Sequence, residues 1–414
     1  MYTYDLGGEA DMPDRILIAG GGIGGLAAAA ALAGKSIASV VLEQAARMGE
    51  IGAGIQIGPN GFHCFDALGI GAQMRDTAVF IDALRLMDAQ TAAEITRIPL
   101  DAPFRAHFGN PYAVVHRAEL HQVLLQRCID SGLVDLRTSQ SATGYAQDGH
   151  RATLHLRDGT HVSGRALIGA EGLRSPIRAQ MLADGEPRVS GHATYRSVIP
   201  RDAMPEDLRM NAATLWAGPK CHIVHYPLKG GTVFNLVVTY HRDALAAVSG
   251  KPVSHAEVAE GFEHVHPSAR AVIEHGRDWK QWVLCDREPV SRWTDGRVAL
   301  LGDAAHPMLQ YFAQGACMAM EDGVALAVAF DAHPDTETAL AAYQSMRLTR
   351  TARVQMNSRL IGDYIYHPDD ARAAVRNEIM QAMSPQDWYD QLTWIYRSNG
   401  LPPDSGGLNM EDMA

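Results

Sequence analysis

Residues 15–43 read RILIAGGGIGGLAAAAALAGKSIASVVLE. Arg15–Ala19 is a short β-branched apolar run, which is typical of a buried strand. The run leads directly into a G-x-G-x-x-G motif at Gly20, Gly22 and Gly25. In such a motif the first glycine permits a tight turn, the second lets the backbone approach a pyrophosphate, and the third lets helix and strand pack closely. The motif therefore predicts a dinucleotide-binding turn.

The residues that follow complete a β-α-β unit. Residues 26–33 are Ala/Leu-rich and predict a helix, whose N-terminus offers free N–H groups to phosphates. A second strand, Ser39–Leu42, ends at Glu43, which can accept both hydroxyls of an adenosine ribose. A glycine-rich connection in an ordinary α/β protein remains the alternative for the motif alone. The complete order of strand, glycines, helix, strand and acid favours the dinucleotide site.

Composition narrows the class of protein. The 414 residues suffice for two domains, and the formal net charge of −11 without a basic cluster argues against nucleic acid as a partner. No segment approaches the length of a membrane span. Five scattered cysteines without metal-ligand spacing predict reduced thiols, no metal and a cytoplasmic location. Residues 1–13 and 401–414 are expected to be disordered tails.

Further cofactor contacts are predicted at strand ends and in glycine-rich loops. Arg47 lies in the loop 44–61 and can contact a phosphate or the active site, unless that loop is a mobile surface segment. Arg117 lies between a strand and a helix, where a cofactor contact and a structural salt bridge are equally compatible with the sequence. Residues 166–175, ALIGAEGLRS, place Glu171 after an apolar strand.

A third strand end lies late in the chain. Residues 297–307, RVALLGDAAHP, place Gly302 and Asp303 after an apolar run, where the carboxylate can bind cofactor hydroxyls. The helix that begins near Gly315 and Ala316 directs its positive end toward the same point.

The fold class predicted from these elements is α/β. It combines a Rossmann-like dinucleotide-binding domain, a mixed-sheet substrate domain and a helical C-terminal part. The dinucleotide-binding domain is expected at 14–82, 104–185 and 286–375, the substrate domain at 83–103 and 186–285, and a helical segment at 376–400. Residues 134–156 predict a small antiparallel ribbon.

The three motifs, in this order and spacing, resemble those of the class A, FAD-dependent aromatic hydroxylases, the single-component flavoprotein monooxygenases. The resemblance covers residues 14–395. It implies that Gly20–Gly25 holds the ADP part of FAD, that Ala170-Glu171-Gly172 serves both FAD and nicotinamide, and that Gly302-Asp303 holds the ribityl chain. Three positions depart from the family: Glu171 replaces Asp, Gln310 stands where Pro is frequent, and Cys317 where Asn is frequent.

Within this family the sequence is most similar to the 3-hydroxybenzoate 6-hydroxylases. The similarity lies in residues 218–231, GPKCHIVHYPLKGG, in Leu309-Gln310-Tyr311 and in residues 286–289, DREP. His222 and Tyr226 are four residues apart on a predicted strand, so their side chains point to one face. Facing one cavity, they can exchange protons with a phenolic substrate; a satisfied core histidine and a packing tyrosine are the alternative.

The resemblance implies tightly bound FAD, transient NADH, O2, a small aromatic acid as substrate and a homodimer. The sequence itself does not distinguish NADH from NADPH. The implied reaction hydroxylates 3-hydroxybenzoate to gentisate through a flavin C4a-hydroperoxide. His222 is the candidate base, Tyr226 orients the ring substituents, and Gln310 orients the substrate across the flavin.

Three other functions are also compatible with parts of the sequence. A related hydroxylase could act on salicylate or 6-hydroxynicotinate with decarboxylation. An NAD-dependent dehydrogenase explains residues 20–43 but not Gly302-Asp303. A flavin-binding sensor protein would bind FAD without turnover.

Overall fold

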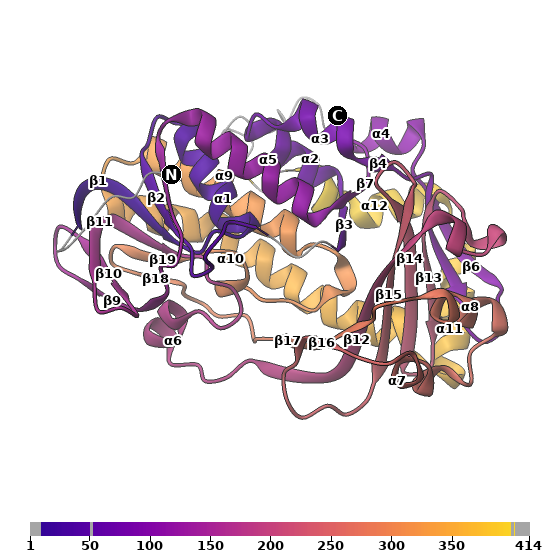
Figure 1. Ribbon diagram of the computed structural model, residues 1–414. Helices are drawn as coiled ribbons and strands as arrows, with labels where there is room; N and C mark the ends of the chain where they lie inside the picture. The colour runs from indigo at the N-terminus through magenta and orange to yellow at the C-terminus, as the bar shows by residue number, and fades with distance from the viewer. Residues whose placement is uncertain (1–9, 50–52, 399–400, 402–414) are drawn as a thin grey trace.

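The computed structural model describes residues 10–49, 53–398 and 401. Two eight-stranded sheets lie at opposite ends of the molecule, with helices α9 (Gly315–Ala332) and α10 (Thr336–Ile361) between them (Figure 1). This arrangement confirms the predicted α/β class. None of the described helices is both long and apolar enough to cross a lipid bilayer.

Strand β1 (Ala10–Ala19) is central in the first sheet and runs parallel to β2 (Ser39–Leu42) and β11 (His161–Gly169). Alternate side chains of β1 are buried on opposite faces. Ile16 packs in the same core as helix α1 (Ile23–Gly34), whereas Leu17 belongs to the core of the other face. Because both faces of the parallel sheet are covered here, residues 16–19 of the strand are all apolar and buried, as the run at 15–19 predicts.

The first sheet has the order β18-β19-β11-β1-β2-β8, with β10 and β9 added beside β11. Its other strands are β8 (Val134–Arg137), β9 (Ala142–Gln147), β10 (Ala152–Leu156), β18 (Thr294–Asp295) and β19 (Val298–Leu300). A smaller sheet consists of β3 (Gly54–Ile57), β7 (Ala113–His116) and β4 (Val79–Phe80).

Helices α1 and α9 pack closely because small residues face each other. A Cβ atom at Gly323 would lie 2.7 Å from the backbone nitrogen of Ala28, and one at Gly24 would lie 3.2 Å from the Cβ of Ala319. The alanine-rich composition of α1 therefore serves a close helix contact as well as helix propensity. This contact brings the N-terminus of α9 close to the glycine turn after β1.

The second sheet has the order β16-β17-β12-β15-β14-β13-β5-β6 and is mixed, because β13 and β5 are parallel while the other pairs are antiparallel. Its strands are β5 (Ala83–Asp88), β6 (Glu94–Pro99), β12 (Arg188–Pro200), β13 (Ala212–Gly218), β14 (Cys221–Leu228), β15 (Val233–His241), β16 (Ser249–Pro252) and β17 (Lys280–Asp286). These strands fall close to the segments 83–103 and 186–285 predicted for the substrate domain.

The remaining α-helices are α2 (Pro59–Ala67), α3 (Gly71–Thr77), α4 (Ala102–Phe108), α5 (Arg117–Ser131), α6 (Pro176–Leu182), α7 (His255–Ala259), α8 (Pro267–His275), α11 (Asp370–Ala382) and α12 (Pro385–Tyr396). Three short turns matter for the site: the 3-10 turns η4 (Gly302–Ala304) and η5 (Gln310–Phe312), and the π-helical turn η6 (Gly362–Tyr366).

Three boundaries differ from the sequence-based expectations. Strand β1 begins within the predicted tail, since Ala10 pairs with Val162; residues 1–9 and 402–414 of the predicted tails lie outside the described residues. Residues 134–137 form a parallel strand beside β2 instead of part of an antiparallel ribbon, because long-range pairing decides the partner of so short a strand. The predicted boundary between 375 and 376 falls inside α11.

Candidate active site

A cavity of about 750 Å³ extends from the glycine turn after β1 to the face of the second sheet. Residues of both sheets line it, together with the turns η4 and η5 and the first residues of α9. A cavity of this volume can enclose an elongated cofactor together with a small ligand.

The glycine turn has the geometry of a phosphate-binding turn. Gly20 has a φ of +108°, and a Cβ atom there would lie 2.4 Å from the carbonyl oxygen of Ala170. A Cβ atom at Gly25 would lie 1.9 Å from the carbonyl oxygen of Gly20, so only glycine fits. Gly22 is the N-cap of α1 and lines the cavity, which directs the free N–H groups of the helix toward it.

Glu43 closes this end of the cavity at the end of β2. Its Oε2 accepts the N–H of Gly21 at 2.7 Å, and its Oε1 accepts the N–H of Ala45 at 2.8 Å. Each carboxylate oxygen keeps a further lone pair for a ribose hydroxyl. Arg47, in contrast, is exposed and does not line the cavity, and residues 50–52 of the same loop lie outside the described residues.

Asp303 is the clearest sign that the cavity takes a polar ligand. Its carboxylate faces the cavity and accepts no hydrogen bond from another described residue, although the surrounding protein raises its pKa by desolvation. Its side chain is exposed within the cavity, so both carboxylate oxygens are free to accept hydrogen bonds from a ligand there. Gly315 and Ala316, the first residues of α9, also line the cavity.

Glu171 and Arg117 also line the cavity wall. The Oε2 atom of Glu171 accepts the hydroxyl of Ser175 at 2.8 Å, while its Oε1 is buried and has no partner. Burial raises the pKa of this carboxyl to about 7. Together with the glycine turn, Glu43 and Asp303, these donors and acceptors fit the phosphates and hydroxyls of FAD.

Strand β14 forms the opposite end of the cavity. His222, Val224 and Tyr226 alternate along the strand, and all three line the cavity. Burial, together with the nearby His192 and His241, lowers the pKa of His222 to about 3, so its imidazole is neutral. Burial also raises the pKa of Tyr226, so its phenol remains protonated. The predicted pair therefore shares one wall of one cavity.

Gln310 is held at the same end by residues of the second sheet. Its Nε2 donates to the hydroxyls of Thr194 and Thr239, at 3.2 Å each, and its Oε1 accepts from Arg196 at 3.0 Å. These contacts fix the amide orientation beside β14. The predicted residues His222, Tyr226 and Gln310 are thus brought together.

Arg196 lines the cavity and was missed by the sequence reasoning. Its guanidinium stacks on Trp282, with 5.4 Å between its Cζ and the ring centroid, and its buried Nε has no hydrogen-bond partner. No carboxylate of the described residues forms an ion pair with it. The available signal was an arginine within residues 193–199, which are otherwise apolar or hydroxyl-bearing, but the face on which it lies depends on the register of β12.

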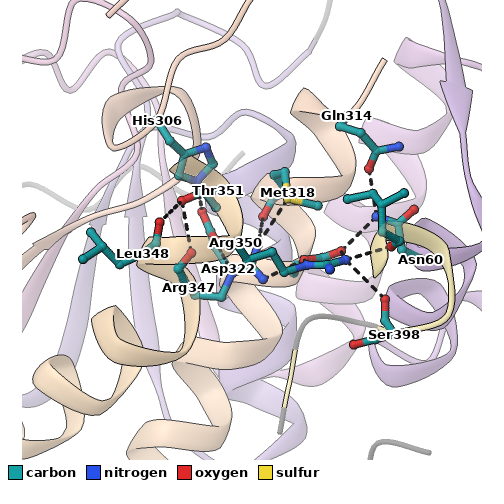
Figure 2. Close-up of polar contacts among 12 residues, drawn as sticks. Asn60, His306, Gln314, Met318, Asp322, Arg347, Leu348, Arg350, Thr351 and Ser398 are labelled. Atoms are coloured by element: carbon teal, nitrogen blue, oxygen red, sulfur yellow. Dashed lines mark hydrogen bonds and ion pairs between the residues drawn. The ribbon is translucent and has the colours of Figure 1, made fainter. Parts of the chain in front are cut away.

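A buried ionic network joins α9 to α10 and to the turn η4, which lines the cavity (Figure 2). Asp322 accepts the N–H of Gly302 at 2.9 Å, His306 Nε2 at 2.5 Å and Arg347 Nε at 2.7 Å. Burial alone would raise the pKa of Asp322, but His306 and Arg347 outweigh it and lower the pKa to about 2. Asp322 therefore fixes the start of the turn that carries Asp303.

Glu321 completes this network on the side of α2 and α12. It accepts Arg347 at 2.6 Å, Arg350 at 2.7 Å and Asn60 at 2.8 Å, and the same Asn60 amide donates to Gln314 at 2.9 Å. Arg350 also donates to carbonyl oxygens in the last turn of α12. The N-cap of α9 is thereby held in place by buried charges.

Comparisons with known proteins agree with this geometry. Residues 14–358 match the family model described as FAD binding domain. The chain is 51% identical to "3-hydroxybenzoate 6-hydroxylase 1" of Aquipseudomonas alcaligenes, over 93% of this chain and 98% of that protein. It is 46% identical to "3-hydroxybenzoate 6-hydroxylase" of Polaromonas naphthalenivorans, over 94% and 97%.

A solved structure of a Klebsiella pneumoniae HpxO variant complexed with FAD superimposes with a TM-score of 0.82, at 26% identity, over 92% of this chain and 97% of that one. The family match and the relatives confirm FAD as the cofactor and exclude the dehydrogenase alternative. The chain belongs to the FAD-binding-domain family, as a class A flavin aromatic hydroxylase.

Proposed function

We propose that the protein hydroxylates 3-hydroxybenzoate to 2,5-dihydroxybenzoate (gentisate), using NADH and O2. The observation that carries this proposal is the half-buried guanidinium of Arg196, which has no ion-pair partner among the described residues and shares a cavity wall with the neutral imidazole of His222. A hydroxybenzoate offers one carboxylate and one phenolic proton, which match these two groups. The two relatives reported above are both named as 3-hydroxybenzoate 6-hydroxylases, which supports the same substrate.

We assign the substrate carboxylate to Arg196. Its planar guanidinium can donate two parallel hydrogen bonds to a carboxylate, and enclosure strengthens the attraction. Gln310 accepts from the same guanidinium and thereby orients it.

We assign His222 as the base for the 3-hydroxyl. Its Nδ1 is engaged by His367, and its Nε2 makes no hydrogen bond to a described residue. A neutral Nε2 facing the cavity can accept the phenolic proton, which raises electron density at the para carbon, C6. Tyr226 and Gln310 would hold the ring so that C6, and not C2 or C4, is presented for reaction.

When bound, FAD accepts a hydride from NADH and, after reaction with O2, supplies an electrophilic oxygen to the substrate. The residues that we propose to hold FAD are Gly20, Gly22, Gly25, Glu43, Arg47, Arg117, Glu171, Gly302, Asp303, Gly315 and Ala316. With the exception of Gly25 and Arg47, each of them lines the cavity. We also propose a homodimer in the cytoplasm; the five free thiols support a reducing compartment, and sedimentation of the FAD-loaded enzyme tests the dimer.

The function is tested by NADH-dependent oxygen uptake with a panel of hydroxybenzoates, with products identified by mass and retention time. We expect 3-hydroxybenzoate to yield gentisate. Catechol and CO2 from salicylate, as the efficient reaction, would instead favour the decarboxylating alternative. Flavin binding without substrate-stimulated turnover would favour a sensor.

The same assay tests the carboxylate contact through Arg196→Met. Truncating one partner of a buried charge pair costs about 2–5 kcal/mol, so KM for 3-hydroxybenzoate should rise by at least about 30-fold. With 3-hydroxybenzyl alcohol, which has no carboxylate, the same substitution should change KM little. An equal rise in KM for both substrates would show that Arg196 does not bind the substrate carboxylate.

Asp303 should matter for FAD retention more than for folding. Because its carboxylate accepts no hydrogen bond from the described residues, Asp303→Ala is expected to remove contacts to the cofactor and not contacts within the protein. Hydrogen bonds to a charged group are worth about 1.5–3 kcal/mol, so the FAD dissociation constant should rise about 10- to 100-fold. Fluorescence titration of the apoprotein measures this. Asp331→Ala, in the exposed last turns of α9, should leave the constant unchanged.

A further inference from the structure

His222 raises a physical problem if it acts as the proposed base. Its side chain is 1% exposed, and burial lowers its pKa to about 3. An imidazolium would therefore be unstable there, and the proton taken from a phenol must leave the residue. The inference below rests on the proposed function, because it concerns where this proton goes.

Hydrogen bonds lead from His222 toward the surface through two more histidines. His222 Nδ1 lies 2.7 Å from His367 Nε2. The other nitrogen of that ring, His367 Nδ1, lies 3.0 Å from His241 Nε2. His367 is buried, whereas His241, the last residue of β15, is partly exposed. Three imidazoles from three elements thus form a continuous row from the cavity to the partly exposed C-terminal end of β15.

A neutral imidazole carries one N–H and one lone pair, on opposite sides of its ring. In the row, the N–H groups can all point outward, with His222 Nδ1–H donating to His367 and His367 Nδ1–H donating to His241. They can equally all point inward, with every ring in its other tautomer. Conversion between these two arrangements moves one proton from one end of the row to the other, and leaves all three rings neutral.

We propose that His222, His367 and His241 form a proton relay between the substrate hydroxyl and solvent. The phenolic O–H bond breaks and an N–H bond forms at His222 Nε2. The Nδ1 proton of His222 passes to His367 Nε2, and the Nδ1 proton of His367 passes to His241 Nε2. The Nδ1 proton of His241 leaves to water. The reverse sequence returns one proton when the product phenolate is protonated, which restores the first arrangement.

The charges around the row favour release at its outer end. Burial and Lys220 lower the pKa of His241, but Asp363 and Asp243 oppose this and favour a proton at the outer end of the row. Burial lowers the pKa of His367 most, and the neighbouring histidines His222, His241 and His192 lower it further. Tyr311 and Tyr366 flank His222 with ring centroids at 5.5 Å and 5.0 Å, and burial raises the pKa of both phenols. A lasting positive charge on His222 or His367 is therefore unfavourable.

His192 flanks the outer end without joining the row. It stacks on His241 with ring centroids 3.6 Å apart and hydrogen-bonds to the hydroxyl of Tyr311 at 2.5 Å. Arg188 and Asp286 are the charged groups that act on it. Its stacking fixes the ring plane of His241.

The backbone is shaped to place His367 in the row. The π-helical turn η6 ends immediately before His367. The backbone N–H of His367 donates to the carbonyl of Gly362 at 3.0 Å. A Cβ atom at Gly362 would lie 2.6 Å from the ring of Tyr311, so the turn requires glycine for this approach. Such π-turns are frequent at functional sites.

The relay is tested with His367→Gln in the FAD-loaded enzyme. Glutamine can keep hydrogen bonds to both neighbours but cannot exchange a proton through ring tautomers. Stopped-flow mixing with 3-hydroxybenzoate, in weak buffer with a pH indicator, measures proton release; ultraviolet absorbance measures phenolate formation. We expect about one proton per site in the wild type and at least about tenfold slower release in the variant. In the variant, the rate should rise with pH as solvent base takes over, and added imidazole should restore it.

Controls separate the relay from folding and from the proposed function. His225→Gln alters a buried histidine of the same strand that contacts Trp216 and does not line the cavity, so its proton release should match the wild type. Benzoate, which has no phenolic proton, should release none in any variant. If His367→Gln does not fold, His241→Gln tests the same row at its outer end.

Wild-type release rates and pH dependence in a folded His367→Gln or His241→Gln would overturn the relay. If the wild-type enzyme forms gentisate but releases no proton when substrate binds, the relay is also overturned, whereas the proposed function is retained. Normal relayed release with no hydroxylation would instead reject the proposed function and retain the relay.

Discussion

His222→Ala should slow hydroxylation of 3-hydroxybenzoate by about 10²–10⁴-fold, the usual loss for a positioned general base. FAD should remain bound, because His222 lies at the end of the cavity away from the glycine turn. Substrate would still occupy the site through Arg196 but would keep its phenolic proton. Oxygen consumption should therefore continue, with hydrogen peroxide appearing in place of gentisate. Product and peroxide yields per NADH measure this.

A neighbouring histidine serves as the control for this result. His225 is as buried as His222 but points to the other side of β14 and accepts the indole N–H of Trp216 at 3.2 Å. His225→Ala should lower stability and leave gentisate formation per bound FAD unchanged. If His222→Ala hydroxylates at the wild-type rate with full coupling, the imidazole is structural.

Arg347→Met should destabilise the protein by about 3–5 kcal/mol, because it removes the one guanidinium that pairs with both buried carboxylates, Glu321 and Asp322. Arg347 is fully buried and pairs with both Glu321 and Asp322. The lost pairing also frees the turn that carries Asp303, so FAD affinity should fall together with stability. Denaturant unfolding of the apoprotein and FAD titration measure the two effects separately.

An exposed pair that also involves α9 provides the comparison. Lys35 and Asp331 lie 2.7 Å apart with side chains 41% and 52% exposed. Exposed pairs contribute about 0–1 kcal/mol, so Lys35→Met should have a small effect. Similar losses for both variants would show that the buried network does not hold the site. Replacing a whole buried network by apolar residues can be neutral, so we assign this one to positioning rather than to net stability.

The sequence determined those features that depend on local spacing. The glycines at 20, 22 and 25 and the acid at 43 predicted the β-α-β unit, because a turn, a helix start and a strand end follow from neighbouring residues. His222 and Tyr226 could be placed on one face because the side-chain direction in a strand alternates with every residue. Gln310 came from the family resemblance, and the structure brings it to the same wall.

Only the tertiary structure decided which partners these faces meet. Arg196 faces the cavity because of the register of β12 against β15, and His367 approaches His222 from 145 residues away. Glu321 and Asp322 are paired by Arg347 of α10, which lies 26 and 25 residues further along the chain, so their role depends on helix packing. Periodicity fixes the side of an element on which a residue lies. The charges and rings that meet it there depend on long-range packing, which local sequence patterns do not encode.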